Sequence, residues 1–118
     1  MLKVSHKQLI DNALEAIETL EIEDAENFLE DDDAMFVDLR DPRELEREGK
    51  IPNAFHAPRG MLEFWVDPTS PYHKEAFASG KRIIFYCQSG WRSALATKAV
   101  QDMGLERVCH IGDGYRGW

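Results

Sequence analysis

The feature that most constrains the fold of this chain is a buried strand that runs directly into a loop and then a helix. Residues 82–86 are mostly hydrophobic and predict a strand that is covered on both faces. The loop CQSGWRS follows at 87–93, and the segment at 92–103 predicts a helix that ends before Gly104. A strand, a short loop and a helix in this order are typical of parallel sheets, because parallel strands need crossover connections.

The rest of the chain repeats this alternation. Further strands are predicted at 20–22 (a short extended piece), 35–40, 54–57 and 108–111. Further helices are predicted from a Ser5 N-cap, with Gln8 completing a capping box, through Leu20, and at 24–29, 42–48, 61–66 and 73–78. We therefore expect an α/β fold in which a central, mainly parallel sheet of about five strands carries helices on both faces. The length and the 43% hydrophobic content suit one domain over residues 1–118.

Cys87 lies where the loop begins. The backbone N–H groups of such a loop and the N-terminus of the following helix converge on its centre and favour negative charge there. A thiolate is negative, so Cys87 is predicted to act as a nucleophile without a neighbouring base. The five residues that follow are predicted to form the anion-binding cradle: Gln88, Ser89, Gly90, Trp91 and Arg92.

Four motifs of the chain resemble those of the rhodanese domain, in the same order and at the same spacing. They are VDLRDP at 37–42 with Glu44, GKIPNA at 49–54, YCQSGWRS at 86–93, and IGDG at 111–114 with Trp118. The resemblance covers nearly all of residues 35–118 and implies a rhodanese-like fold of the small, single-domain sulfurtransferase type.

The resemblance implies transfer of a sulfane sulfur through a persulfide on Cys87. In this reaction the cysteine attacks a donor such as thiosulfate and releases sulfite. The persulfide then passes its outer sulfur to cyanide or to a thiol, including a protein thiol, and the cradle stabilises the anionic persulfide. We expect no cofactor and no metal, because Cys109 and His110 offer too few ligands for a zinc site.

The chain departs from the family pattern at several positions. Gln88 and Ser89 are neutral, whereas thiosulfate-specialised members often carry basic side chains there, which argues against thiosulfate as the physiological donor. Lys50 replaces the usual histidine of the second motif, and Asp113 replaces a glycine of the last one. Neither change affects the nucleophile.

Three alternative functions compete with sulfur transfer. A non-catalytic binding module of the rhodanese fold would use it to dock a partner, although the retained cysteine favours an enzyme. A phosphatase would need the Cys-x5-Arg loop of the dual-specificity enzymes that share this fold, whereas Cys87 and Arg92 form a shorter Cys-x4-Arg loop. A Cys–His hydrolase would need a histidine beside Cys87, and His110 is a candidate that the sequence does not place.

Several residues are candidates for supporting the site. Asp38 and Arg40 are predicted to form an ion pair that ties a strand end to the loop. Glu44 is expected either at the pocket rim or in water, and Arg59 either at the anion site or on the surface. Arg92 is expected to hold an anion in the pocket, with outward pairing to an acidic residue as the alternative.

Two further side chains are predicted to differ in exposure. Trp91 is expected to be partly exposed, where it would cover the entrance or dock a protein acceptor. Cys109 lies in an apolar strand and is expected to be an inert buried thiol.

The charge of the chain limits its partners. Asp and Glu number 22 against 14 Lys and Arg, a net charge of −8, which argues against nucleic acid or an anionic membrane as a partner. No apolar stretch approaches the roughly 20 residues that span a bilayer, and the first residues do not resemble a leader. We therefore expect a cytoplasmic protein, in a compartment where free thiols persist.

Overall fold

The computed structural model describes residues 1–118 and contains a five-stranded, all-parallel sheet. Its strands are β1 (Glu18–Leu20), β2 (Ala34–Asp38), β3 (Phe55–His56), β4 (Arg82–Tyr86) and β5 (Val108–Ile111). Their order across the sheet is β1-β5-β4-β2-β3, so β4 is the central strand. Because every pair is parallel, the carboxyl ends of all strands share one edge, where open sheets of this kind bind ligands.

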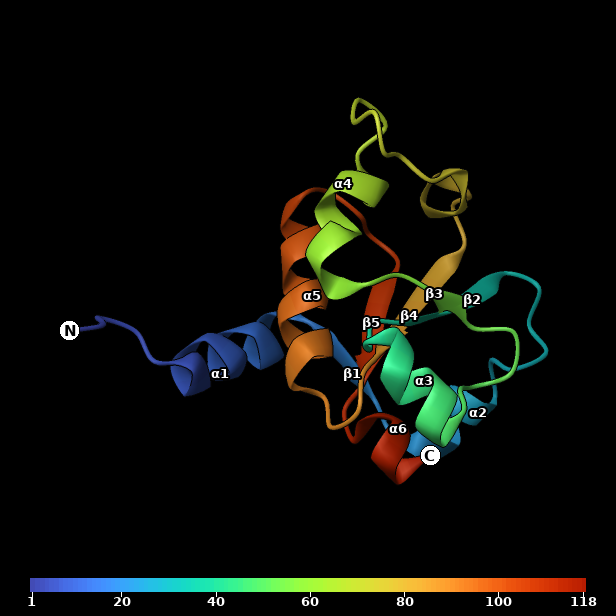
Figure 1. Ribbon diagram of the computed structural model, residues 1–118, viewed down its shortest axis with the longest axis horizontal. Coiled ribbons are helices and arrows are strands. Elements are labelled where there is room, and N and C mark those ends of the chain that lie inside the picture. Colours follow the sequence, from blue (N-terminus) through green and yellow to red (C-terminus); the bar gives the residue numbers. More distant parts are fainter.

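Six helices and two 3-10 turns surround the sheet (Figure 1). Their bounds are α1 (His6–Ala16), α2 (Ile22–Glu26), α3 (Pro42–Glu48), α4 (Leu62–Val66), α5 (Trp91–Asp102) and α6 (Gly114–Gly117), with 3-10 turns at Arg59–Met61 and Glu75–Ala78. None of these helices has both the length and the apolar character that crossing a membrane requires.

The two faces of the sheet carry separate hydrophobic clusters. Ile83 and Phe85 of β4 face α4 and α5, whereas Ile84 and Tyr86 face α2 and α6. All four side chains are buried, as expected for a parallel strand covered on both sides. The expected α/β sheet with helices on both faces is therefore confirmed.

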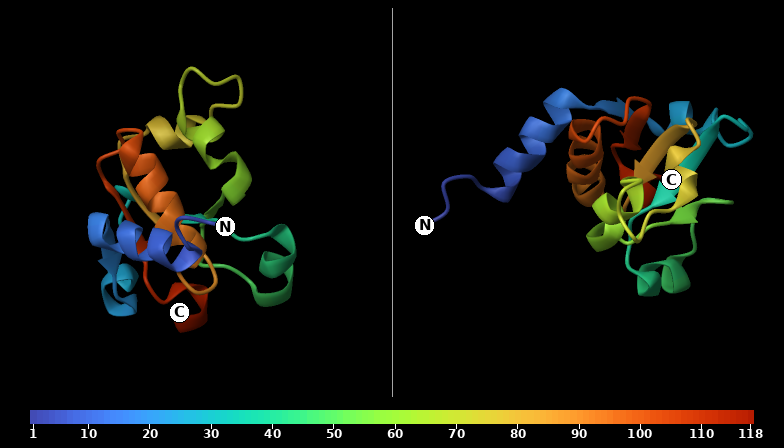
Figure 2. Two further views of the ribbon diagram at one scale, coloured as in Figure 1. Left: turned by 90° about the vertical axis from the view of Figure 1, so that its left-hand side faces the viewer. Right: turned by 90° about the horizontal axis from the view of Figure 1, so that it is seen from above.

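Helix α1 lies outside these two layers. Its buried residues Ile10 and Ala13 pack against Ala94 of α5, so α1 covers a helix and not the sheet. The N-terminal end of α1 projects from the body of the molecule (Figure 2).

The strongest local signals place their elements as predicted. Strands β4 and β5 occupy residues 82–86 and 108–111. Helix α3 begins at Pro42 and ends before Gly49, and Asp41 caps it through a capping box. Proline at the first helical position and glycine after the last one explain why these bounds could be predicted.

The prediction for the N-terminal region was wrong in two respects. The helical spacing continues through Leu20, but α1 ends at Ala16. The short strand predicted at 20–22 is β1 at 18–20, where the backbone pairs with β5, and residue 22 already begins α2. Ser5 caps α1 by accepting a hydrogen bond from Gln8 N, yet the Gln8 side chain donates to Asn12 and does not close a capping box.

Other elements are shifted by a few residues. The helix predicted at 24–29 is α2 at Ile22–Glu26, and the one predicted at 73–78 is only the 3-10 turn at Glu75–Ala78. Helix α5 begins one residue earlier than predicted, at Trp91. The remaining strands and α4 lie within their predicted segments to within two residues.

Candidate active site

The loop after β4 lies at the carboxyl edge of the sheet, and Gly90 gives it its sharp turn into α5. Gly90 has φ +98° and is the N-cap residue of that helix. A side chain there would be strained by this angle and would collide with the Gly112 carbonyl. Glycine therefore lets the loop fold closely against the end of β5.

The Cys87 sulfur lies inside the curve of the loop. Gly90 N donates to Sγ at 3.2 Å and Ser93 N at 3.4 Å, so the first turn of α5 directs two backbone N–H groups at the sulfur. Cys87 is only 1% exposed. Two N–H groups that converge at a helix N-terminus favour negative charge on this sulfur.

Arg92 pairs with Glu44 across the mouth of the loop. Its guanidinium donates to Glu44 Oε1 at 2.8 Å and to Oε2 at 3.0 Å, a bidentate ion pair. The hydrogen bonds from Arg92 lower the pKa of Glu44 to about 2, against the opposing effect of partial burial. In turn, the pairing with Glu44, and then attraction to Cys87, raise the pKa of Arg92.

The hydrogen bonds of Arg92 go to an acidic residue, which is the alternative expected for it, and the attraction to Cys87 appears only in the direction of its pKa. Glu44 lies beside the cysteine loop. Its carboxylate is also held by the start of its own helix, because Asp41 N donates to Glu44 Oε1 at 3.0 Å.

Asp38 and Arg40 form the expected ion pair, and both side chains are fully buried. Arg40 Nη2 donates to Asp38 Oδ2 at 2.8 Å and to the Gly49 carbonyl at 2.7 Å. Arg40 Nη1 donates to Gln88 Oε1 at 3.3 Å. This pair therefore ties the end of β2 to the end of α3 and to the cysteine loop.

The other predicted loop side chains do not face the sulfur. The Gln88 amide donates to Glu48 of α3 at 2.9 Å, and Ser89 is exposed. Trp91 is 58% exposed, as expected, and its ring lies 5.3 Å from that of His6 of α1. The cradle is consequently made by backbone groups, and these three side chains form its outer surface.

Arg59 is not part of the site. It lies in the 3-10 turn before α4, and its guanidinium donates to Glu63 Oε1 at 2.8 Å, one helical turn away. The surface alternative for Arg59 is the one that the structure shows.

The sequence analysis did not assign a role to Ser93 and did not place His110. Ser93 Oγ is 3.6 Å from Cys87 Sγ and 2.8 Å from His110 Nδ1, and His110 Nε2 is 3.1 Å from Thr19 Oγ1. A histidine in a strand that is buried on both faces must find polar partners, and this signal could have pointed to it. Burial lowers the pKa of His110 to about 4, so its ring is neutral near pH 7.

Cys109 is buried, as expected. Burial raises the pKa of its thiol to about 11, which keeps the thiol protonated near neutral pH. Cys87 and Cys109 are both free, and no group of three or more His, Cys, Asp or Glu side chains is arranged to hold a metal ion.

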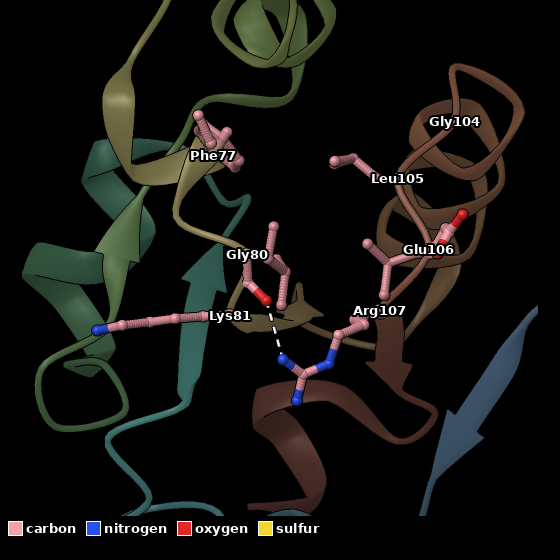
Figure 3. Close-up of a pocket in the computed structure, with 10 residues that line it drawn as sticks. Phe77, Gly80, Lys81, Gly104, Leu105, Glu106 and Arg107 are labelled. Carbon is pink, nitrogen blue, oxygen red and sulfur yellow. Dashed lines mark hydrogen bonds between the residues drawn. The ribbon is translucent and has the colours of Figure 1, made fainter.

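The cavities of the molecule do not contain Cys87. One of about 400 Å³ lies between α1 and the outside of the cysteine loop and is lined by Trp91 and His110 among others. Another, of about 360 Å³, lies at the amino ends of β4 and β5, opposite the loop. Figure 3 shows Phe77 and Leu105 on its two sides and Arg107 donating to the Gly80 carbonyl, so that guanidinium is already occupied.

A family model decides the classification. The model of the rhodanese-like domain matches residues 21–118, more than the span from residue 35 that the motifs indicated. The chain belongs to the rhodanese-like domain family. The five-stranded parallel sheet and the cysteine at the end of its central strand are the framework of this rhodanese-like domain.

Two curated relatives carry sulfurtransferase names. A sulfurtransferase of Allochromatium vinosum is 28% identical over 87 residues, which cover 74% of this chain and 73% of that protein. The thiosulfate sulfurtransferase/rhodanese-like domain-containing protein 3 of Mus musculus is 26% identical over 97 residues, covering 78% of this chain. The match spans 62% of the mouse protein, less than two thirds of its length.

A solved structure resembles the whole chain. It is a protein of unknown function from Rhodopseudomonas palustris CGA009, described as a possible tyrosine phosphatase. That protein is 49% identical and superimposes with a TM-score of 0.96, covering 100% of this rhodanese-like domain and 91% of its own chain.

Proposed function

We propose that this chain is a sulfurtransferase that carries sulfane sulfur as a persulfide on Cys87. Members of its family generally take sulfur from a small donor and pass it to a thiol acceptor. The observation that supports this role is the convergence of Gly90 N and Ser93 N on Cys87 Sγ, at 3.2 and 3.4 Å. These donors favour a negative sulfur both before and after it accepts a second sulfur atom.

The reaction has two displacement steps. In the first, the Cys87 thiolate attacks the outer sulfur of a donor such as thiosulfate, the new S–S bond forms, and the old one breaks with its electron pair leaving on sulfite. In the second, cyanide or a thiolate attacks the outer sulfur of the persulfide, and Cys87 leaves as a thiolate. The cradle holds the negative charge at Cys87 at both ends of this cycle, so no general base is needed.

The donor is proposed to be less anionic than thiosulfate. The loop presents no basic side chain other than Arg92, and both Nη atoms of Arg92 already donate to Glu44. A doubly charged donor must compete with that carboxylate. A persulfide on a small thiol or on a protein meets less repulsion, and the exposed Trp91 beside the loop offers an apolar contact for a protein.

Intact mass spectrometry tests the proposed chemistry. After incubation with thiosulfate or with a small-molecule persulfide, the protein should gain the mass of one sulfur atom and lose it again on treatment with a reductant. Cys87→Ser should remain folded by circular dichroism and show no gain, whereas Cys109→Ala should gain sulfur like the parent. A parent protein that never gains sulfur from any donor would contradict the proposal.

A non-catalytic binding module is the second candidate, and the 1% exposure of Cys87 is the observation that favours it. The same mass experiment separates the two, because a binding module would keep its mass. A Cys-dependent phosphatase is separated by an aryl phosphate assay. We expect hydrolysis near background, because the Cys-x4-Arg loop is one residue shorter than the loop that encircles phosphate.

A further inference from the structure

Ser93, His110 and Thr19 form a line of hydrogen-bonding side chains that ends at the Cys87 sulfur. The line runs from Cys87 Sγ to Ser93 Oγ at 3.6 Å, on to His110 Nδ1 at 2.8 Å, and from His110 Nε2 to Thr19 Oγ1 at 3.1 Å. Cys87, Ser93 and His110 are all buried, and they come from the loop, from α5 and from β5. The proposed transfer chemistry does not use this line.

We propose that His110 is a positioning residue that directs the Ser93 hydroxyl toward the Cys87 sulfur, so that Ser93 supplies a third hydrogen bond to the thiolate. This role goes beyond the cradle of backbone N–H groups, and it deepens the proposed sulfur transfer by naming the side chains that hold its nucleophile.

While Ser93 is bonded to both Cys87 and His110, the hydrogen-bonding capacity of each group allows the line two arrangements. A neutral imidazole has one N–H donor and one acceptor nitrogen, and each hydroxyl has one donor. When Cys87 is a thiol, its S–H donates to Ser93 Oγ, Ser93 donates to His110 Nδ1, and His110 Nε2–H donates to Thr19. When Cys87 is a thiolate, the order reverses: Thr19 donates to Nε2, and Nδ1–H donates to Ser93.

The reversed order leaves the Ser93 hydroxyl proton only two acceptors. They are Cys87 Sγ and the Gly90 carbonyl, which lies 3.3 Å from Ser93 Oγ. A thiolate carries a full negative charge and a carbonyl only a partial one, so the hydroxyl donates to the sulfur. Ionisation of Cys87 is therefore coupled to a change of tautomer at His110. One proton leaves to solvent at the exposed Thr19 end of the line, and the imidazole ring is neutral before and after.

Charged groups on the neighbouring elements set the background for this effect. Near Cys87 lie Arg92 of α5, Glu44 of α3, which binds Arg92, and Arg40, which reaches the loop through Gln88. The cavity beside His110 is lined by three ionisable side chains of α1: His6, Lys7 and Asp11. None of them bonds to Ser93 or His110, so changes at those two positions leave these groups in place.

The rate of Cys87 alkylation by iodoacetamide, measured against pH, tests the role of Ser93. Peptide mass analysis assigns the product to Cys87 and not to Cys109. Ser93→Ala should move the midpoint of the profile upward by about one pH unit, the effect of losing one hydrogen bond to a charged group. Ser93→Thr keeps the hydroxyl and should restore most of the shift. Ser79→Ala, an identical change on an exposed turn at the opposite end of β4 from Cys87, should leave the profile unchanged.

Variants of His110 test the positioning role. His110→Phe keeps a flat aromatic ring without the nitrogens and should raise the midpoint by part of the Ser93→Ala shift. His110→Asn keeps a polar atom near the place of Nδ1, so its midpoint should lie between those of the parent and of His110→Phe. In the parent protein, nitrogen NMR of the His110 ring should show one protonated nitrogen throughout, moving from Nε2 to Nδ1 with the midpoint of Cys87 ionisation.

Two results would overturn this assignment. A folded Ser93→Ala variant with an unchanged alkylation profile would show that the hydroxyl does not bind the thiolate. A His110 ring that carries protons on both nitrogens while Cys87 is ionised would make the histidine an ion-pair partner and not a positioning residue. Alkylation does not depend on sulfur transfer, so failure of this role and failure of the proposed function are distinguishable.

Discussion

If the proposed sulfur transfer is correct, replacement of Glu44 by glutamine should raise the thiosulfate:cyanide sulfurtransferase activity. Glu44 holds the guanidinium of Arg92 through two hydrogen bonds of 2.8 and 3.0 Å. An anionic donor that is to use Arg92 must first displace this carboxylate, and it also meets the negative charge. Glu44→Gln removes the charge and weakens the hold on Arg92, because a neutral amide is a poorer partner for a guanidinium than a carboxylate.

The size of the effect follows from the pKa of Glu44. Its fall from 4.5 to about 2 corresponds to roughly 3 kcal/mol of stabilisation of the carboxylate. That value is an upper bound for the pair, because Asp41 N and Arg40 also lower this pKa, and because 41% of the Arg92 side chain is exposed and solvent screens the pair. Discounting it leaves about 1–2 kcal/mol, which converts to a gain of roughly 5–30-fold in kcat/KM for thiosulfate.

The assay is thiocyanate formation from thiosulfate and cyanide, followed at several concentrations of thiosulfate. The gain should lie mainly in KM, since the backbone cradle of Cys87 is unchanged. Glu63→Gln is the matched control: Glu63 also pairs with an arginine, accepting one hydrogen bond from Arg59 at 2.8 Å away from the loop, and its replacement should leave kcat/KM unchanged. For a persulfide donor that carries no charge at its reacting end, kcat/KM should also change little in Glu44→Gln.

A double variant shows whether the gain passes through Arg92. With Arg92→Ala alone, kcat/KM for thiosulfate should fall, and the loss of a charge-assisted contact is worth about 1.5–3 kcal/mol. If freed Arg92 produces the gain, Glu44→Gln combined with Arg92→Ala should lose it. A Glu44→Gln enzyme that is no better than the parent with thiosulfate, while still forming the persulfide, would refute this view of the pair.

Three further outcomes are expected. Burial lowers the pKa of His110 to about 4, so on acidification the unfolded chain binds a proton before the folded one does. The free energy of unfolding from urea titrations should therefore be full above about pH 6.5 and fall by roughly 3 kcal/mol toward pH 4. His110→Asn should reduce this dependence on pH. The lowered pKa of Glu44 adds stability that is present above about pH 4.5 and is lost toward pH 2, and Glu44→Gln should remove that second window in the same titrations. Cys109→Ala should transfer sulfur at nearly the parent rate in the thiocyanate assay, because burial keeps this thiol protonated.

The sequence predicted those elements whose signals are local. The strand at 82–86 has a continuous apolar run, and α3 has proline at its start and glycine after its end. It failed at residues 17–20, where the helical spacing of Ile17 and Leu20 continues but the backbone pairs with β5 instead. A three-residue strand is fixed by its partner, about ninety residues away, and not by its own composition.

In the candidate site, too, the features that the sequence predicts are local, and those it does not predict are contacts between distant elements. Cys87 and the turn at Gly90 could be predicted because they lie in one short segment between a strand and a helix. The directions of Gln88 and Arg59 could not, since each side chain points to a carboxylate on a helix, Glu48 and Glu63. The contact between Ser93 and His110 joins α5 to β5, so only the packing of these elements reveals it.

The backbone of the cysteine loop is fixed by hydrogen bonds from α6 as well as by those within the loop. This affects which groups can select the sulfur donor. Tyr115 N donates to the Cys87 carbonyl at 2.8 Å and Arg116 N to the Gln88 carbonyl at 3.0 Å. This contact requires glycine at 114, where φ is +66° and a side chain would collide with the Gln88 carbonyl. A backbone bonded on both sides is preorganised for any sulfur anion. Under the proposed function, discrimination among donors must therefore come from side chains at the mouth, of which Glu44 and Arg92 carry the charge.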